Sequence, residues 1–251
     1  MGSLLARSLA GLPEVRPGDD VAALIVGALV EWPLRSGHVV AIAHKVVSKA
    51  EGAVVALDQV SASPRALELG RAQDKDPRAV QVVLDQSTHV LRAERGVLVC
   101  RTRHGFVCAN AGVDASNASA PDTVVVLPRD PDGSARRIRA RLRELTGQAP
   151  AVLIADSFGR TWRHGQLDVA IGLAGMQPLD DWRGRTDAAG LELRATWLAV
   201  ADAAAACSEL LRAKDSGEPV VVIEGLERYV AEDDGPGAAA LLRAPEEDLF
   251  S

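Results

Sequence analysis

Oxygen-bearing side chains follow two segments of apolar or small residues in this sequence. Asp156 and Ser157 come directly after AVLIA, and Asp114 and Asn117 lie in GVDASN. A carboxylate at the carboxyl end of a buried strand is held rigidly, and an adjacent hydroxyl supplies a second oxygen for a hard cation beside a phosphate. Plainer interpretations stay open, because Asp156 could cap a turn and the Asp114–Asn117 segment could form an Asx-turn.

Two further segments carry positive charge suited to an anionic ligand. GRTWRHGQ holds Arg160, Arg163 and His164 between glycines, and arginine side chains bind phosphates or carboxylates through paired hydrogen bonds. Lys49, in KVVSKAEG, would meet a phosphate as a point charge. The plainer interpretations are a solvated loop whose Trp162 packs on the core and an ordinary solvated lysine.

Several nucleotide, metal and hydrolase motifs are missing from the sequence. It has no GxxxxGK[ST] P-loop, no GxGxxG after a strand, no HExxH, no CxxC pair and no GxSxG. The odd set Cys100, Cys108 and Cys207 argues against a disulfide framework and for a reducing compartment. A cysteine-nucleophile hydrolase built on Cys108 and His104 stays as an alternative, although a cysteine among small residues is more often a packing group.

The composition is that of a globular protein. The chain has 251 residues, of which 47% are hydrophobic, 25% are charged and only 3% are aromatic, so Ala, Val and Leu must build the core. The net charge of −6 argues against a general nucleic-acid binder, which needs clustered Lys and Arg. The N-terminal apolar run is too short for a signal peptide or membrane span, so we expect a cytoplasmic protein without nucleic-acid or membrane partners.

The elements that must position these side chains follow from periodicity and turn signals. We expect buried strands over 38–44, 123–128, 151–156 and 219–226, a hairpin over 89–102 with Gly96 in its turn, and helices over 21–30, 64–84, 135–147 and 195–214. Asp19 or Asp20 would cap the first helix, and Gly147 would end the third. Strands and helices are mixed without strict βαβ alternation, which favours an α+β or mixed-sheet fold. Segments 101–122 and 157–190 remain as long irregular loops, which suggests that they bind a ligand.

Seven segments, in this order, resemble the coenzyme F420-0:gamma-glutamyl ligase family. They are GLPEVRPGDD (11–20), KVVSKAEG (45–52), GFVCANAGVDASN (105–117), DSFGRTWRHGQLDVAIGLAG (156–175), WRGRTDAAGLEL (182–193), AVADAAAACSELL (199–211) and PVVVIEGL (219–226). The resemblance implies one family unit over 1–251, open to division into two subdomains, with mixed sheets, helices and no P-loop. Some relatives continue into a nitroreductase-like flavin domain after a segment like LLRAPEEDLF. We expect no such domain here, and the choice between a standalone ligase and an isolated ligase domain stays open.

The resemblance also implies a reaction. The family adds L-glutamate, with GTP, to the lactyl carboxylate of the deazaflavin precursor F420-0, and then adds further glutamates by gamma-linkage. It uses Mn2+ or Mg2+, is assisted by potassium and forms homodimers. A carboxylate is a poor electrophile, so the hypothesis is that GTP first converts it to an acyl phosphate. A non-catalytic GTP- and metal-binding module, and a ligase acting on another acceptor, stay as alternatives, and the number of glutamates added stays open.

The family's metal-binding and catalytic positions can be carried over to this sequence. Asp114 and Asp156 match metal-binding carboxylates, which also makes them catalytic candidates, and Ser157 matches a second metal contact. Two metals between these residues would neutralise charge on the phosphoryl oxygens. Arg160 and Arg163 are added as catalytic candidates from their residue type alone, to hold a phosphate or a substrate carboxylate.

The family's nucleotide-binding positions fall in three segments. Lys49 and Asn117 match guanine-nucleotide contacts, and a further nucleotide-binding segment matches Leu12, Pro13, Glu14 and Val15. His44 stands where relatives often have Ser. It is included among the nucleotide contacts with its role open, because histidine is bulkier and titrates near neutral pH.

Overall fold

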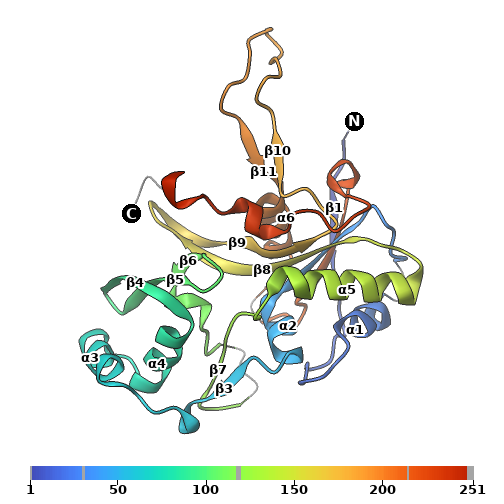
Figure 1. Cartoon of the computed structure of the whole chain (residues 1–251). Coiled ribbons are helices and arrows are strands. Elements are labelled where there is room, and N and C mark those ends of the chain that lie inside the picture. Colours follow the sequence, from blue (N-terminus) through green and yellow to red (C-terminus); the bar gives the residue numbers. More distant parts are fainter. Residues whose placement is uncertain (1, 30–31, 117–119, 214, 248–251) are drawn as a thin grey trace.

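A mixed five-stranded sheet forms the centre of the computed structural model, which describes residues 2–29, 32–116, 120–213 and 215–247 (Figure 1). Its strand order is β1 (Leu5–Ser8), β12 (Val220–Glu224), β2 (Val39–Ala43), β8 (Ala151–Arg160) and β9 (Arg163–Ala174). Only β2 and β8 are parallel, and the other neighbours are antiparallel. The predicted α+β class with mixed sheets is therefore confirmed.

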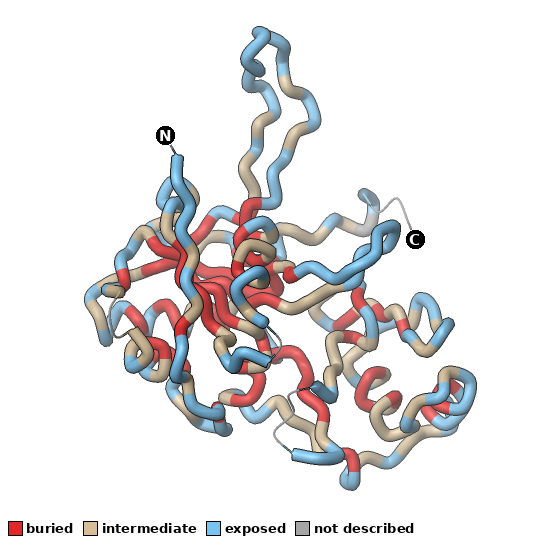
Figure 2. Tube along the Cα trace, turned by 180° about the vertical axis from the view of Figure 1, so that it is seen from behind, coloured by how far each residue is buried: buried red, intermediate tan, exposed pale blue. Residues whose placement is uncertain are grey.

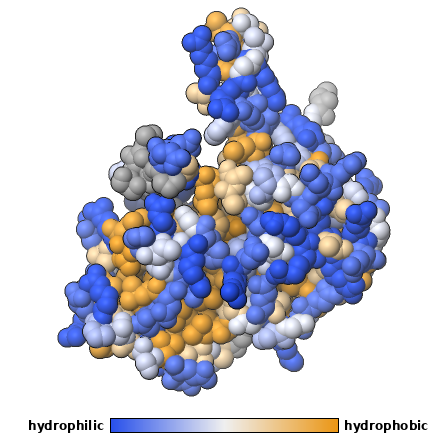
Figure 3. Space-filling model, in the orientation of Figure 1, coloured by the Kyte–Doolittle hydropathy of each residue, from blue (hydrophilic) through white to orange (hydrophobic). Residues whose placement is uncertain are grey.

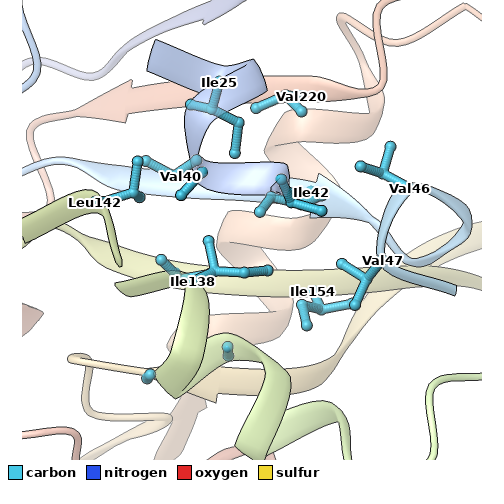
Figure 4. Packing of buried hydrophobic residues seen from close by; sticks show 14 of the residues in the cluster. Ile25, Val40, Ile42, Val46, Val47, Ile138, Leu142, Ile154 and Val220 are labelled. Carbon is cyan, nitrogen blue, oxygen red and sulfur yellow. The ribbon is translucent and has the colours of Figure 1, made fainter. Parts of the chain in front are cut away.

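Helices cover both faces of this sheet, which explains why its strands read as continuous apolar runs. Val40 and Ile42 of β2 pack towards α1 (Val21–Ala28) and α5 (Pro131–Thr146) (Figure 4). Val39 and Ala41, the alternate residues, pack with α6 (Val200–Glu209) on the opposite face. The central strands are accordingly the most continuously buried part of the chain (Figure 2). No helix in the described ranges is both long and apolar enough to cross a membrane.

A smaller part of the molecule lies beside the sheet and has its own apolar clusters. Its elements are α3 (Pro64–Gln73), α4 (Pro77–Asp85), a three-stranded sheet of β4 (Ser87–Glu94), β5 (Val97–Thr102) and β6 (Val107–Ala109), and the pair β3 (Val54–Ala56) and β7 (Thr123–Val125). Short 3-10 turns cover Leu57–Gln59, Asn110–Gly112, Glu227–Tyr229, Ala238–Leu241 and Pro245–Glu247. The expectation of one family unit over 1–251 stays a prediction.

Local capping and turn signals were reliable. The Asp20 side chain accepts a hydrogen bond from the Ala23 amide and caps α1, and Gly147 ends α5 in the left-handed conformation at φ 72°. The 89–102 hairpin turns at Arg95 and Gly96, whose φ angles of 53° and 75° suit a type I′ turn. The first helix ends at Ala28, and position 30 of its predicted range lies outside the described residues.

Four predicted segments need correction. The single helix over 64–84 is two helices, because Pro77 starts a new one that is capped by Asp76. The helix over 195–214 is limited to α6, since β11 (Trp197–Ala199) pairs with β10 (Leu179–Asp181) instead. The segment 157–190 is not irregular, because β8 continues through Arg160 and turns into β9. Within 101–122, β6 also forms a regular strand.

Two hairpins extend from the body of the molecule. The β8–β9 hairpin continues beyond the point where β8 leaves β2, at the pair Ala43 and Ala155. The second hairpin, which we call the arm (residues 179–199), projects away from the body of the molecule (Figures 1 and 2), and within the described residues only its base contacts other elements, where the Tyr229 hydroxyl bonds to Asp180. Leu191, Trp197 and Leu198 of the arm are exposed, and hydrophobic residues are visible among its polar ones (Figure 3).

Candidate active site

A cavity of about 690 Å³ lies at the carboxyl ends of β2 and β8. Most of the residues that the sequence singled out line it, although they come from four separate segments: Leu12, Pro13, Glu14, Val15, His44, Lys49, Asp114, Asp156 and Ser157. The cavity therefore joins the expected metal-binding and nucleotide-binding positions in one place. Their individual roles stay predictions.

Parallel pairing of β2 and β8 explains how His44 and Asp156 meet. The last paired residues are Ala43 and Ala155, so the next residue of each strand emerges at the same edge. His44 Nε2 lies 3.4 Å from Asp156 Oδ1, and His44 Nδ1 lies 3.2 Å from Ser48 Oγ one helical turn ahead. His44 begins α2 (His44–Ala50), and its ring is buried.

The Asp156 carboxyl group is held in an environment that disfavours its charge. Its pKa is raised to about 7. Burial is the main cause and the negative charges of Asp168 and Asp114 add to it, while the 2.8 Å hydrogen bond from the Ser157 amide to Oδ1 and the charge of Lys45 act in the opposite direction. A carboxylate in such a place is stabilised by a nearby cation. This is the electrostatic setting expected of a ligand for a positively charged group.

Asp114 is fixed against the neighbouring strand and has a cation beside it. Its backbone exchanges hydrogen bonds of 3.0 and 2.8 Å with Val125, and its side chain accepts bonds from Lys45 Nζ at 2.5 Å and the Ser116 amide at 2.7 Å. The last bond is the Asx-turn of the plainer interpretation, and the role of Asp114 as a metal ligand stays a prediction. Burial would raise the pKa of the carboxyl group, but the bonds from Lys45 and Ser116 outweigh it and lower the pKa.

Lys45 was missed by the sequence reasoning, although it also lines the cavity. Besides Asp114, its Nζ atom donates 2.8 Å hydrogen bonds to the carbonyl and hydroxyl oxygens of Ser116. The available signal was its spacing from Lys49, since residues four apart share one face of a helix. That spacing becomes informative only if residues 44–50 are recognised as a helix. Lys49 itself pairs with Glu14, Nζ to Oε1 at 2.6 Å.

A buried polar network supports Ser157. Its hydroxyl donates a 2.6 Å hydrogen bond to Asp168 Oδ1 across the β8–β9 pair, and Asp168 Oδ2 pairs with Arg212 Nη2. Arg212 also donates to Ser208 Oγ at 3.0 Å, and Glu209 Oε2 accepts from the Asp168 amide at 2.9 Å. Asp168 and Arg212 line the cavity, so the network also adds charge at its wall. Both residues were missed, because they become neighbours only through the tertiary structure.

Arg160 and Arg163 do not line the cavity. They lie at the turn of the β8–β9 hairpin, where Arg160 Nη2 donates to the His164 carbonyl and both side chains are exposed. Their catalytic role, proposed from residue type, has no support from the geometry of a single chain. Asn117, the remaining candidate, lies outside the described residues.

The oxygen atoms at the cavity suit a hard divalent ion whose remaining coordination positions are filled by a bound ligand. The described residues contain no cluster of three or more His, Cys, Asp or Glu side chains arranged for a metal. Magnesium is usually bound through one or two carboxylates together with substrate phosphates and water. Asp156 is half-buried with a raised pKa, and Ser157 supplies a hydroxyl beside it. These residues fit a metal that arrives with a phosphate-bearing molecule.

Cys108 does not have the environment of a nucleophile. Burial, followed by the charge of Asp156, raises the pKa of its thiol to about 12. His104 Nε2 lies 2.9 Å from the Pro128 carbonyl oxygen, and its ring stacks on Phe106. Cys108 stands opposite Cys100 on the neighbouring strand, and both are buried. The cysteine-hydrolase interpretation thus loses its physical basis.

Alkylation should separate the three cysteines. With iodoacetamide at pH 8, we expect Cys108 in the native protein to react at least about 100-fold more slowly than in denatured protein, because its thiolate is scarce and shielded. Cys100 is the matched buried control, and the partly exposed Cys207 should react first. Peptide mass spectrometry over time measures all three. Rapid native modification of Cys108 would restore the nucleophile interpretation.

Comparisons with known proteins point in one direction. Residues 11–225 match the family described as F420-0:Gamma-glutamyl ligase. The chain is 44% identical to the coenzyme F420:L-glutamate ligase of Methanopyrus kandleri over 100% of both chains. It is 43% identical to the protein of that name from Methanothermobacter thermautotrophicus over 96% of each chain, and 39% identical to the one from Methanocaldococcus jannaschii over 95% of this chain and 94% of that protein. The similarity includes every segment that lines the cavity.

Proposed function

We propose, since this chain belongs to the F420-0:gamma-glutamyl ligase family, that it joins L-glutamate to coenzyme F420-0 with GTP as co-substrate. The first glutamate would be linked through its alpha-amine to the lactyl-type carboxylate, and later ones by gamma-linkage. One observation carries this proposal. Asp114 and the adjacent pair Asp156 and Ser157, which come from two separate segments, line a single cavity together with Lys49.

The reaction has two steps. An acceptor carboxylate oxygen attacks the gamma-phosphorus of GTP, so that a new O–P bond forms, the bond to the beta-phosphate oxygen breaks, and GDP leaves. The neutral amine of glutamate then attacks the acyl carbon of the resulting acyl phosphate. A C–N bond forms, the C–O bond to phosphate breaks, and the amine releases a proton. Phosphate is a good leaving group, which makes amide formation possible at useful rates.

The chain contributes charge and orientation to these steps. Lys45 and Lys49 would place positive charge beside the phosphates, and Asp114, Asp156 and Ser157 would hold Mn2+ or Mg2+. When bound, such a metal neutralises negative charge that develops on phosphoryl oxygens. Potassium would assist. Leu12, Pro13, Val15 and His44 would form the nucleotide wall together with Glu14, whose carboxylate keeps Lys49 in place.

Product analysis tests this function directly. Incubation with F420-0, GTP, L-glutamate and Mn2+ should give products heavier by one or more glutamate residues, together with GDP and phosphate. Mass spectrometry and phosphate release measure both. Release of phosphate should require the acceptor and glutamate together. Unchanged acceptor with GTP still bound would favour a non-catalytic binding module, and turnover only with a different deazaflavin acceptor would favour the second alternative.

We propose further that the protein is a cytoplasmic homodimer in which the arm contacts a second copy. A two-stranded hairpin is only marginally stable without further packing, yet the arm exposes Leu191, Trp197 and Leu198. Arg183 lies over the Trp197 ring at 4.1 Å, which keeps a cation and an aromatic surface together. The same surface on two copies would give a symmetric contact. The free cysteines accord with a reducing compartment.

Shortening the arm should reveal the dimer. Replacing residues 182–196 with a two-residue Asn-Gly turn should convert the dimer to a monomer without altering α6 or the central sheet, because the arm packs on little else. Sedimentation velocity gives the mass, and circular dichroism reports the fold. Leu210→Ala, on the exposed end after α6, is the control for loss of an apolar surface residue. A monomeric parent protein would contradict the proposal.

A further inference from the structure

The turn of the β8–β9 hairpin presents an aromatic ring among positive charges. Trp162 is 82% exposed at this turn, between Arg160 and Arg163. The Arg160 guanidinium group bonds to the carbonyl oxygen of His164, which ties the turn together without neutralising the charge. Among the described residues, the side chains of Trp162 and Arg163 make no hydrogen bond or ion pair, and both are exposed. A single exposed apolar side chain is common on protein surfaces, so the significance of Trp162 lies in its position between two arginines at the end of the hairpin.

The hairpin connects this turn to the cavity. Phe158 packs edge-on against Phe106, with ring centroids 6.1 Å apart, and this contact anchors one face of the hairpin. Residues of the opposite face, Ser157, Gln166 and Asp168, line the cavity. Because side chains alternate along a strand, this face continues to the pair Gly159 and Gln166, after which a register shift leads to the pair Arg160 and Arg163 at the turn. The hairpin is therefore an extended wall that begins at the candidate active site.

Gly159 leaves this wall open between the cavity and the turn. It pairs with Gln166, on the face that also carries Ser157 and Asp168. A Cβ atom built at Gly159 would meet nothing within 4 Å, so neighbouring protein atoms do not require a glycine there. The bare backbone permits a flat ligand to approach closely.

We propose that this face binds the aromatic ring of an anionic deazaflavin acceptor, with Trp162 stacking on the ring and Arg163 facing its negative charge. The inference rests on the proposed function and names a subsite for it. From Ser157 to Arg160 the strand spans roughly 10 Å, at about 3.3 Å per residue. An acceptor whose reactive carboxylate and ring lie at opposite ends can reach from the cavity to the turn.

The charge and size of the turn favour such a molecule over a protein partner. Arg160 and Arg163 make the turn locally positive in a chain whose net charge is −6, and tryptophan is well suited to stack with a planar ring beside cations. A single exposed ring at a narrow turn offers far less area than a stable protein interface, which needs about 800 Å² from each partner. Two copies of the same positive turn would also repel each other.

Substitutions at Trp162 and Arg163 test the subsite. We expect Trp162→Ala to weaken acceptor binding by about 10- to 100-fold, with GTP and Mn2+ binding unchanged, and Trp162→Phe to keep most of the affinity. Arg163→Ala should weaken acceptor binding and reduce its salt dependence. Arg65→Ala, on the exposed face of α3, is the matched control. Calorimetric titration with F420-0, and separately with GTP and Mn2+, measures each affinity, and the KM for each substrate provides a kinetic check.

The outcomes separate this inference from the proposed function. Wild-type turnover with an unchanged acceptor Kd and KM in Trp162→Ala would overturn the subsite and leave the function standing. Loss of acceptor affinity that accompanies a change from dimer to monomer in sedimentation would also overturn it, since the turn would then be a subunit contact. A wild-type protein that neither binds nor converts F420-0 would overturn both. Selective loss of acceptor affinity supports the subsite.

Discussion

Asp156→Asn should abolish ligation and, at the same time, make the metal-free protein more stable at neutral and alkaline pH. We expect turnover to fall at least about 1,000-fold, because loss of one charged metal ligand removes electrostatic stabilisation of the phosphoryl transfer. The gain in stability has a separate cause. The pKa of the Asp156 carboxyl group is about 7 in the folded protein, against 3.8 ordinarily, and asparagine carries no charge to bury.

The sign of the pH dependence follows from which state loses its proton first. Below about pH 4 the carboxyl group is protonated in both states and contributes no difference. Between about pH 4 and pH 7 the unfolded chain ionises while the folded protein retains its proton, so wild-type stability falls as pH rises. Above pH 7 the penalty is constant, on the order of a few kcal/mol by the usual 1.36 kcal/mol for each pKa unit. The variant lacks this penalty.

Urea unfolding at pH 4, 6 and 8 without metal measures this difference. The variant and the wild type should converge at pH 4, and the variant should be more stable at pH 8. Asp58→Asn, at an exposed carboxylate of the Leu57–Gln59 turn, should leave both activity and the difference unchanged. Mn2+ with GTP should stabilise the wild type far more than Asp156→Asn. Full activity in Asp156→Asn would remove it from the metal site, and a destabilised variant at pH 8 would contradict the electrostatic argument.

Arg212→Met should be the most destabilising single change near the cavity. Arg212 and Asp168 are both buried, and removal of the guanidinium group leaves a carboxylate without its cation. Breaking a buried pair in this way costs about 3–5 kcal/mol, which lowers Tm by on the order of 10 °C in a chain of this size. Turnover should fall as well, because Asp168 accepts the hydrogen bond that orients the Ser157 hydroxyl.

A second substitution distinguishes a lost interaction from a stranded charge. In Arg212→Met with Asp168→Asn no charge remains buried, so most of the lost stability should return while activity stays low. Arg65→Met breaks the exposed pair with Glu68 and should change the free energy of unfolding by less than about 1 kcal/mol. Scanning calorimetry with a double-mutant cycle measures these terms. Equal losses in Arg212→Met and the double variant would show that the buried charge is not the cause.

Local signals in the sequence predicted local structure well. The cap at Asp20, the helix end at Gly147 and the turn at Gly96 depend on a few neighbouring residues, and all three were found. The β8–β9 hairpin was missed because the pairing of Ser157 with Asp168 is set across the strands, and Gly159 and Gly165 obscure the alternation. Asp156 was therefore placed at the tip of a short strand, whereas it lies within a long one where β2 ends.

Sequence could predict those site residues whose type or match to the family is informative without knowledge of their spatial neighbours. Asp114, Asp156 and Lys49 were found by residue type and by resemblance, and all line the cavity. Lys45, Asp168 and Arg212 were missed because their importance depends on partners that are distant in sequence. Arg160 and Arg163 were wrongly expected near the cavity because they follow Asp156 closely in the sequence. Residues a few positions apart on an extended strand lie far apart in space. They lie at the turn because β8 continues through Arg160, a length that the sequence did not reveal.

The order of strands in the central sheet determines how much of the chain must be synthesised before the sheet and the cavity can form. β12, the last strand of the described residues, lies between β1 and β2, and among those residues β1 pairs with no other strand. On the ribosome, the first strand must therefore wait unpaired until more than 200 further residues have emerged. Arg212, just before β12, completes the cavity at the same late moment. We expect the nascent chain to gain nucleotide affinity only after β12 has emerged from the ribosome, and its exposed strand edges to depend on chaperones until then.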